Sequence, residues 1–161
     1  MSNNIQEDFI YCCELGDIDK VKKLLKDYRV DPSGYDNSAI RLSSHNGNIE
    51  VVRELIKDPR IDPSGRDNYA IRFSSKYGHL DVVKELLNDP RVDPSDQNNF
   101  AIRWSSINGH IDIIKELLKD PRINKQKLLD SDIKDELRNE VLDYLNEVRD
   151  GLIDKVLDTD I

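Results

Sequence analysis

Residues 62–92 read DPSGRDNYAIRFSSKYGHLDVVKELLNDPRV, and closely similar stretches stand directly before and after them. The two other copies cover 31–61 and 93–123, so equivalent residues lie 31 positions apart. A fixed period of about 20 to 50 residues indicates a row of small, similar units that stack on one another. The sequence therefore predicts a repeat architecture before any single motif is considered.

Each copy begins with turn-forming residues and continues with two helical patterns. In the middle copy we expect a loop over 62–68, because Pro, Ser, Gly, Asp and Asn favour turns and Asn tolerates the left-handed conformation. A first helix is expected over 69–77, ending at Gly78, since glycine suits the left-handed residue after a helix. Apolar residues recur at steps of three and four over 80–87, which predicts a second helix.

A single copy is too small to fold alone. It offers about eight side chains for burial at roughly 1.5–3 kcal/mol each, whereas ordering the backbone costs roughly 1–2 kcal/mol per residue. Neighbouring copies must therefore cover its faces, and paired serines in each first helix are small enough to let successive helices approach. These pairs are Ser43–Ser44, Ser74–Ser75 and Ser105–Ser106. The predicted fold is an all-α solenoid of helix-turn-helix units.

The flanking segments are expected to close the two ends of the row. Shifted by one period, the first residues follow the repeat pattern, but Lys20 stands where the copies have valine or isoleucine. A polar residue on an outer face suits a terminal unit. The predicted domains are an N-terminal capping repeat over 1–30, three repeats over 31–123 (31–61, 62–92 and 93–123), and a C-terminal helical cap over 124–161.

Beyond Ile123 one long helical pattern replaces the repeats. Ser131 is a suitable N-cap, and a helix from Ser131 to Asp158 would be roughly 40 Å long at about 1.5 Å per residue. It either runs as one piece or breaks at Gly151, where glycine costs about 1 kcal/mol. Such a helix could fold over the last repeat, or pair with a second chain, since its pattern exceeds about 25 residues.

Composition argues against several classes of function. The formal charge of −8 is unfavourable for a nucleic-acid partner, because affinity for phosphate backbones comes mainly from Lys and Arg. An acidic balance favours solubility or a basic partner. No apolar run reaches the roughly 18 residues of a membrane span, and the first residues lack the basic-then-apolar order of a secretory signal. We therefore expect a cytoplasmic protein that binds neither membranes nor nucleic acid.

No arrangement of residues indicates catalysis, a metal or a cofactor. Cys12 and Cys13 are adjacent, which fits a reducing compartment; we expect small packed side chains, with a thiol nucleophile or metal ligand as the alternative. His79 and His110 are expected to hydrogen-bond the turn backbone. Their one-repeat spacing of roughly 10 Å is too wide for a shared zinc ion bound at about 2 Å. The expectation is a non-enzyme with no catalytic residues, metal or cofactor.

Arg41, Arg72 and Arg103 occupy one position in the three repeats. They could form an anion-binding ladder, or they could tie adjacent loops together through hydrogen bonds to carbonyl groups or to Asp. Their position beside a core isoleucine favours the second interpretation.

The repeated pattern AIRxSSxxGHxDxxKELL resembles the ankyrin repeat, whose usual core reads TPLHxAAxxGHxxxVxxLL. Ile71 stands for its leucine, Arg72 for its histidine and Gly78–His79 for its glycine-histidine pair. The unit is shorter than the usual length of about 33 residues. Its DPS and AIR signatures are similar to ankyrin repeats abundant in large DNA viruses of amoebae. The resemblance covers 1–123 and implies a scaffold that binds proteins through its finger tips and concave face, here as a viral protein inside a host cell.

Positions that differ between otherwise similar repeats are free to contact a partner, and Tyr, Trp and Arg anchor interfaces most often. We therefore predict a non-enzymatic protein-protein interaction module. Its predicted protein-binding residues are Tyr35, Arg66, Tyr69, Phe73, Lys76, Tyr77, Trp104 and Ile107. For Phe73 and Trp104, packing between neighbouring helices is the alternative role. The alternative function is a self-associating structural or scaffold protein, a homodimer joined by the C-terminal helix.

Overall fold

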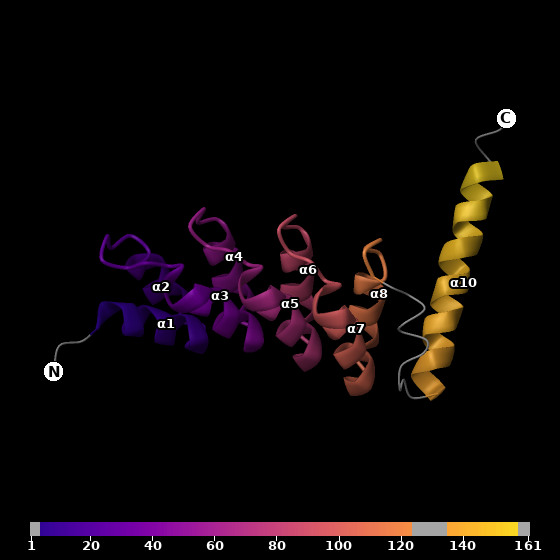
Figure 1. Cartoon of the computed structure of the whole chain (residues 1–161), viewed down its shortest axis with the longest axis horizontal. Helices are drawn as coiled ribbons and strands as arrows, with labels where there is room; N and C mark the ends of the chain where they lie inside the picture. Colours follow the sequence, from indigo (N-terminus) through magenta and orange to yellow (C-terminus); the bar gives the residue numbers. More distant parts are fainter. Residues whose placement is uncertain (1–3, 124–134, 158–161) are drawn as a thin grey trace.

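A computed structural model describes residues 4–123 and 135–157, and every regular element in these two ranges is an α-helix. Helix pairs follow one another along the long axis of the molecule (Figure 1). The first helices of the pairs are α1 (Ile5–Leu15), α3 (Gly34–His45), α5 (Gly65–Tyr77) and α7 (Asp96–Asn108). The second helices are α2 (Ile18–Leu24), α4 (Ile49–Ile56), α6 (Leu80–Leu87) and α8 (Ile111–Leu117). Helix α10 (Asp135–Leu157) stands at the end of the row.

The first helices lie side by side, with α3 against α1, α5 against α3 and α7 against α5. The small residues predicted to allow this approach are fully buried: Ser44, Ser75 and Ser106 have no exposed surface, and Cys13 takes the same position in α1. Isoleucines at one repeat position, Ile40, Ile71 and Ile102, are also fully buried. The predicted all-α solenoid is therefore confirmed.

Three consecutive left-handed residues open each of α3, α5 and α7. In α5 they are Arg66, Asp67 and Asn68, with φ of 53°, 55° and 57°. We call the three-residue segments 35–37, 66–68 and 97–99 the finger turns. Left-handed L-residues cost roughly 1–2 kcal/mol each, and Asn and Asp tolerate them best. The right-handed helix begins at Tyr69, as predicted, but the sequence led us to expect left-handed Asn, not three such residues in a row.

The last residue of each of the first two finger turns holds the start of the next unit. The side-chain Oδ1 of Asn68 accepts a hydrogen bond from the backbone N–H of Asp93 at 2.7 Å, and Asn37 does the same for Asp62 at 2.8 Å. Gln6 takes this role in the N-terminal pair, accepting from the N–H of Asp31 at 2.8 Å. The N-terminal helix pair is therefore joined to the row by the same contact as the repeats.

The helix-ending glycines bring each unit close to the next. Gly47 has φ of 76°, and a Cβ placed on it would lie 2.5 Å from Nδ1 of His79. Both the backbone conformation and the nearby imidazole therefore require glycine here. The His79 ring donates from Nε2 to the backbone oxygen of His45 at 2.9 Å, and His110 donates likewise to Lys76 at 3.0 Å. The predicted role of these histidines in binding turn backbone is confirmed.

Helix α10 packs against α8. Val141 is fully buried there, the Tyr144 hydroxyl donates to the backbone oxygen of Lys115 at 3.4 Å, and the Lys115 ammonium pairs with Glu140 at 3.0 Å. The expectation that the helix covers the last repeat is thus confirmed. The helix continues through Gly151, whereas the predicted N-cap Ser131 lies outside the described residues. The domain boundaries given above stay a prediction.

An Asp–Arg clip follows each second helix of the helix pairs. In the clip of α6, Arg91 donates two hydrogen bonds to the two carboxylate oxygens of Asp89, at 2.9 and 2.6 Å, and a third to the backbone oxygen of Ile61 at 2.8 Å. Hydrogen bonds from Arg91 hold the pKa of Asp89 below its ordinary value. The arginine therefore joins its own loop to the loop of the preceding unit. Equivalent clips pair Asp27 with Arg29, Asp58 with Arg60, and Asp120 with Arg122.

We expect Arg91→Met to lower the free energy of unfolding by about 1–3 kcal/mol, because it removes the guanidinium donors of the buried Asp89 carboxylate and of the Ile61 carbonyl. Arg60→Met is the matched control, since the described hydrogen bonds of Arg60 go to Asp58 alone. Urea denaturation measures both variants. Equal losses would show that the contact to the preceding loop contributes nothing.

Candidate functional site

Aromatic side chains from three consecutive first helices form one continuous cluster. Tyr69, Phe73 and Tyr77 follow one another at steps of four along α5, a spacing that places them on one helix face. The ring centroids of Tyr69 and Phe73 are 4.0 Å apart. His45 of α3 lies 4.6 Å from Tyr77 on one side, and Phe100 of α7 lies 5.6 Å from Phe73 on the other. We call the set His45, Tyr69, Phe73, Tyr77, Phe100 and Trp104 the aromatic cluster.

Three cations lie over the rings of this cluster. The Lys76 ammonium is 4.4 Å from the Trp104 centroid. The Arg41 guanidinium is 5.3 Å from Tyr69, and that of Arg72 is 5.0 Å from Phe100. Each of the two arginines thus stacks on a ring of the following unit, which orders the guanidinium and the ring together. The surface made by α3, α5, α7 and their finger turns is called the first-helix face below.

The structure brings five of the eight predicted site residues together: Tyr69, Phe73, Lys76, Tyr77 and Trp104 all belong to the aromatic cluster or lie over it. Tyr35 lies apart, in a hollow of about 380 Å³ between α1 and α3. Arg66 forms an exposed ion pair with Asp36 at 2.8 Å. Ile107 is 42% exposed. Phe73 and Trp104 are half-buried, so they serve both as packing between units and as surface.

Sequence reasoning missed four contributors to this site. His45 and Phe100 were not predicted as site residues, although Phe100 lies four positions before Trp104 and occupies the repeat position of Tyr69. That spacing and register were the available signal. For Arg41 and Arg72 the sequence favoured a structural role over an anion-binding ladder. Their stacking on rings depends on how consecutive units are placed, which the sequence does not state.

The repeated arginines bind carbonyl groups, as predicted, but those of their own finger turns. Arg41 donates to the backbone oxygens of Asp36 and Tyr35 at 2.9 and 3.1 Å, and Arg72 donates to that of Arg66 at 3.1 Å. The prediction that they tie adjacent loops together is therefore wrong in detail. Each arginine is long enough to fold back over its own turn, where strained left-handed residues expose their carbonyl groups.

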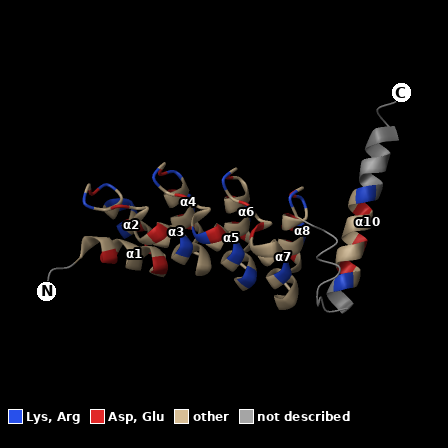
Figure 2. Cartoon of the chain, viewed as in Figure 1, with Lys and Arg blue, Asp and Glu red and all other residues tan. Residues whose placement is uncertain are grey.

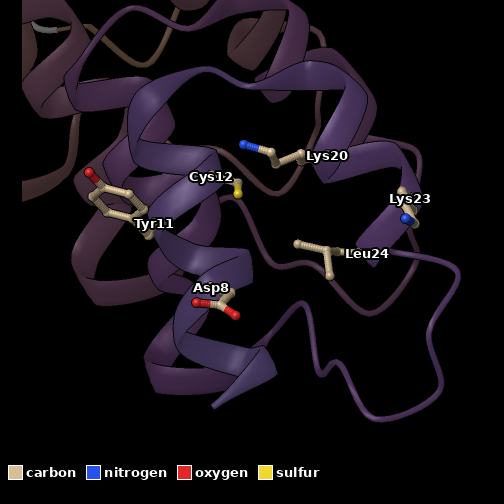
Figure 3. A pocket seen from close by; sticks show the side chains of 6 residues that line it. All are labelled: Asp8, Tyr11, Cys12, Lys20, Lys23 and Leu24. Carbon is tan, nitrogen blue, oxygen red and sulfur yellow. The ribbon is translucent and has the colours of Figure 1, made fainter. Parts of the chain in front are cut away.

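A second hollow, of about 410 Å³, lies on the outer side of the N-terminal helix pair (Figure 3). Its lining residues are Asp8, Tyr11, Cys12, Lys20, Lys23 and Leu24. Cys13 beside it is fully buried, and burial raises the pKa of its thiol to about 12. A thiol with so high a pKa stays protonated and is a poor nucleophile. The expected packing role of the cysteines is confirmed by their burial.

Within residues 4–123 and 135–157, no group of His, Cys, Asp and Glu is arranged to hold a metal ion. Over the same ranges no helix is both long enough and apolar enough to cross a bilayer.

His45 is the titratable member of the aromatic cluster. Its Nδ1 lies 3.3 Å from the Tyr69 hydroxyl. Burial, followed by the nearby His79 and the charge of Lys76, lowers the pKa of His45 below its ordinary value, and the opposing effect of Glu14 is smaller. The imidazole among the rings is therefore neutral at pH 7.

A row of helix pairs joined by side-chain contacts to the neighbouring backbone is the architecture of a helical repeat solenoid. The chain belongs to the ankyrin-repeat family: a family model described as ankyrin repeats in three copies matches residues 9–94. That range begins in α1 and ends before α7, yet α7 and α8 repeat the arrangement of α5 and α6. No curated protein sequence matches the chain.

We expect the stability of the protein to fall as pH drops below about 6.5, the ordinary pKa of histidine. In that window the unfolded state binds a proton at His45, whereas the folded state, with its lowered pKa, does not. His45→Gln should therefore lose less stability than the wild type between about pH 7 and pH 5. Thermal unfolding followed by circular dichroism measures this; parallel curves for both proteins would contradict the assignment to His45.

Proposed function

We propose that this chain is a non-enzymatic binding module whose protein partner contacts the first-helix face at the aromatic cluster. Ankyrin repeats are in general modules for protein-protein interaction. The observation that carries the proposal is the continuity of six rings across three units outside the apolar core. Aromatic side chains give large contact area with few rotatable bonds, so ordering them on binding costs little.

The exposure of the cluster supports a contact with a partner. Tyr77 is 45% exposed and Ile107, one turn beyond Trp104, is 42% exposed. The side chain of Lys76, from α5, places its ammonium over the ring of Trp104 in α7. A partner side chain placed here would remove apolar ring surface from water, which stabilises a complex by about 25 cal/mol per Å² of apolar surface.

The finger turns extend the proposed site. Tyr35 and Arg66 occupy the first left-handed position of their turns, where glycine or asparagine would be less strained. Tyr35 is 60% exposed. Large side chains kept at a strained, exposed position are consistent with a role in contacting a partner, through the finger tips and what we propose to be a concave face.

The biological setting is part of the same proposal. A viral origin, and action in the cytoplasm of a host cell without membrane or nucleic-acid ligands, is supported by the DPS and AIR signatures and by the acidic net charge of −8. The non-enzymatic nature of the protein is supported by its membership of a family of interaction modules.

We expect Tyr77→Ala and Trp104→Ala each to weaken capture of the partner from a native cell lysate by at least about fivefold, the effect of losing a contact worth 1 kcal/mol. Tyr28→Ala is the matched control, because Tyr28 is 94% exposed and lies outside the aromatic cluster. Captured proteins are quantified by mass spectrometry and folding is checked by circular dichroism. Unchanged capture by folded variants would place the binding site elsewhere.

Self-association through α10 is the alternative proposal. One side of α10 packs on α8, while Leu142 and Val148 are 36% and 39% exposed. Light scattering of the whole chain decides between the two: a dimer mass that reverts to the monomer in Leu142→Glu supports self-association. A monomer mass at high concentration rules it out.

A further inference from the structure

We propose that the first-helix face selects an acidic, extended segment of its protein partner, with carboxylates at every third residue bound by Arg41, Arg72 and Arg103. This inference rests on the proposed function and assigns a chemical class to the partner. It differs from the expectation that net charge alone gives, which is a basic partner.

The pairing of the arginines distinguishes this face from the rest of the surface. Within residues 4–123, Arg41, Arg72 and Arg103 are the arginines that have no carboxylate within ion-pair distance. Lys76, on the same face, also has no such partner there. The remaining arginines of that range form ion pairs, those of the clips at 2.6–2.7 Å. In a chain with an excess of acidic residues, unpaired arginines in a row are a specific feature.

The two sets of helices also differ in charge balance. Helices α3, α5 and α7 carry five Lys and Arg against three Asp, whereas α4, α6 and α8 carry three Lys and Arg against six Asp and Glu. In Figure 2, blue segments recur on α3, α5 and α7. The three Asp are Asp36, Asp67 and Asp96; Asp36 is paired with Arg66, and Asp96 accepts a hydrogen bond from Asn68. The first-helix face is therefore locally basic.

The guanidinium groups are held in place with donors unused. The hydrogen bond from Arg72 to the Arg66 backbone oxygen uses one donor, and its buried Nε has no partner. Arg103 makes one long hydrogen bond, of 3.4 Å, to the backbone oxygen of Asn98. A guanidinium has five N–H donors and matches a carboxylate in a two-bond arrangement. Stacking on Tyr69 and Phe100 fixes Arg41 and Arg72 before a partner arrives.

An anion would also relieve an unfavourable environment. Burial, and then the neighbouring charge of Arg66, lower the pKa of Arg41. This direction means that the cationic form of Arg41 lacks adequate compensation from nearby carboxylates. A bound carboxylate would supply that compensation.

The spacing of the arginines indicates an extended ligand. The three residues occupy one position in consecutive units, and packed helices lie roughly 8–10 Å apart. A chain in the extended polyproline II conformation rises about 3.1 Å per residue with three residues per turn, so carboxylates three residues apart lie on one side of the chain, about 9 Å apart. The residues between them would contact Phe73 and Trp104, which calls for apolar side chains at those points. Carboxylates interspersed with apolar residues therefore fit both parts of the face.

The test uses a dye-labelled peptide made of four copies of Asp-Leu-Thr, with a matched peptide of four copies of Asn-Leu-Thr. A third peptide has the acidic composition with its carboxylates in adjacent pairs. Fluorescence anisotropy measures binding to the whole chain at about 50 mM and about 500 mM salt, where screening differs strongly. We expect the spaced acidic peptide to bind at least about tenfold more tightly than the neutral peptide at low salt, and this advantage to shrink at high salt.

Variants connect the effect to the proposed residues. Arg72→Met and Arg103→Met should each weaken binding of the spaced acidic peptide by about three- to tenfold, as expected for a charge-assisted hydrogen bond at a partly exposed site. Arg60→Met is the control that should leave binding unchanged, because Arg60 is already paired with Asp58. Lys76→Gln is a further variant, which removes a cation of the first-helix face. The Lys76 side chain contacts rings, so its loss leaves the finger turn intact.

The outcomes separate this inference from the proposed function. Equal binding of acidic and neutral peptides, with loss in Tyr77→Ala and Trp104→Ala, would overturn the acidic class and leave the aromatic site standing. Binding below detection at about 1 mM peptide would overturn the inference, as would equal loss in Arg60→Met. Tighter, arginine-dependent binding of a thymidine dodecamer would show a general polyanion site instead. Salt-sensitive dimers that the arginine variants abolish would identify a second copy of this chain as the occupant.

Discussion

Hydrogen bonds from the side chains of one unit to the backbone of its neighbour are the constraint on which the structure depends. They occur at three parts of the repeat. At the finger turn, Asn68 accepts from the N–H of Asp93, and at the helix end, His110 donates to the carbonyl of Lys76. At the clip, Arg122 donates to the carbonyl of Val92 at 2.9 Å. A unit too small to bury its own faces is thereby fixed to the next in both distance and rotation.

Because successive units are related in the same way, residues at one repeat position lie at equivalent places on successive units. Residues that are the same in every copy, such as Ile71 and Ser75, face the neighbouring helix and are buried. At the repeat positions of Tyr69 and Phe73, the next unit has Phe100 and Trp104. Aromatic side chains of adjacent units therefore meet. The proposed site thus needs no cleft, because it is formed by different side chains at the same positions of successive repeats.

Charge is arranged on the same basis. The repeat places one arginine in each clip next to an aspartate. It places another in each of α3, α5 and α7, where the guanidinium donates to carbonyl groups of the finger turn and not to carboxylates. The result is a basic first-helix face on an acidic protein. Because salt screens exposed charges beyond about 8–10 Å, a partner in contact with this face is affected by the local balance more than by the net charge of −8.

The sequence by itself determined the unit, its two helices, the helix-ending glycines, the bonds of His79 and His110 to turn backbone, and the long helix that follows the last repeat. These follow from periodicity and residue type, which act within one unit or recur in all of them. Only the tertiary structure decided that three left-handed residues stand in each finger turn, that Tyr35 lies apart from the aromatic cluster, and that His45, Phe100 and the arginines join it. Ring and cation contacts within about 6 Å depend on the offset between successive units, and that offset arises from packing between units, which no single repeat encodes.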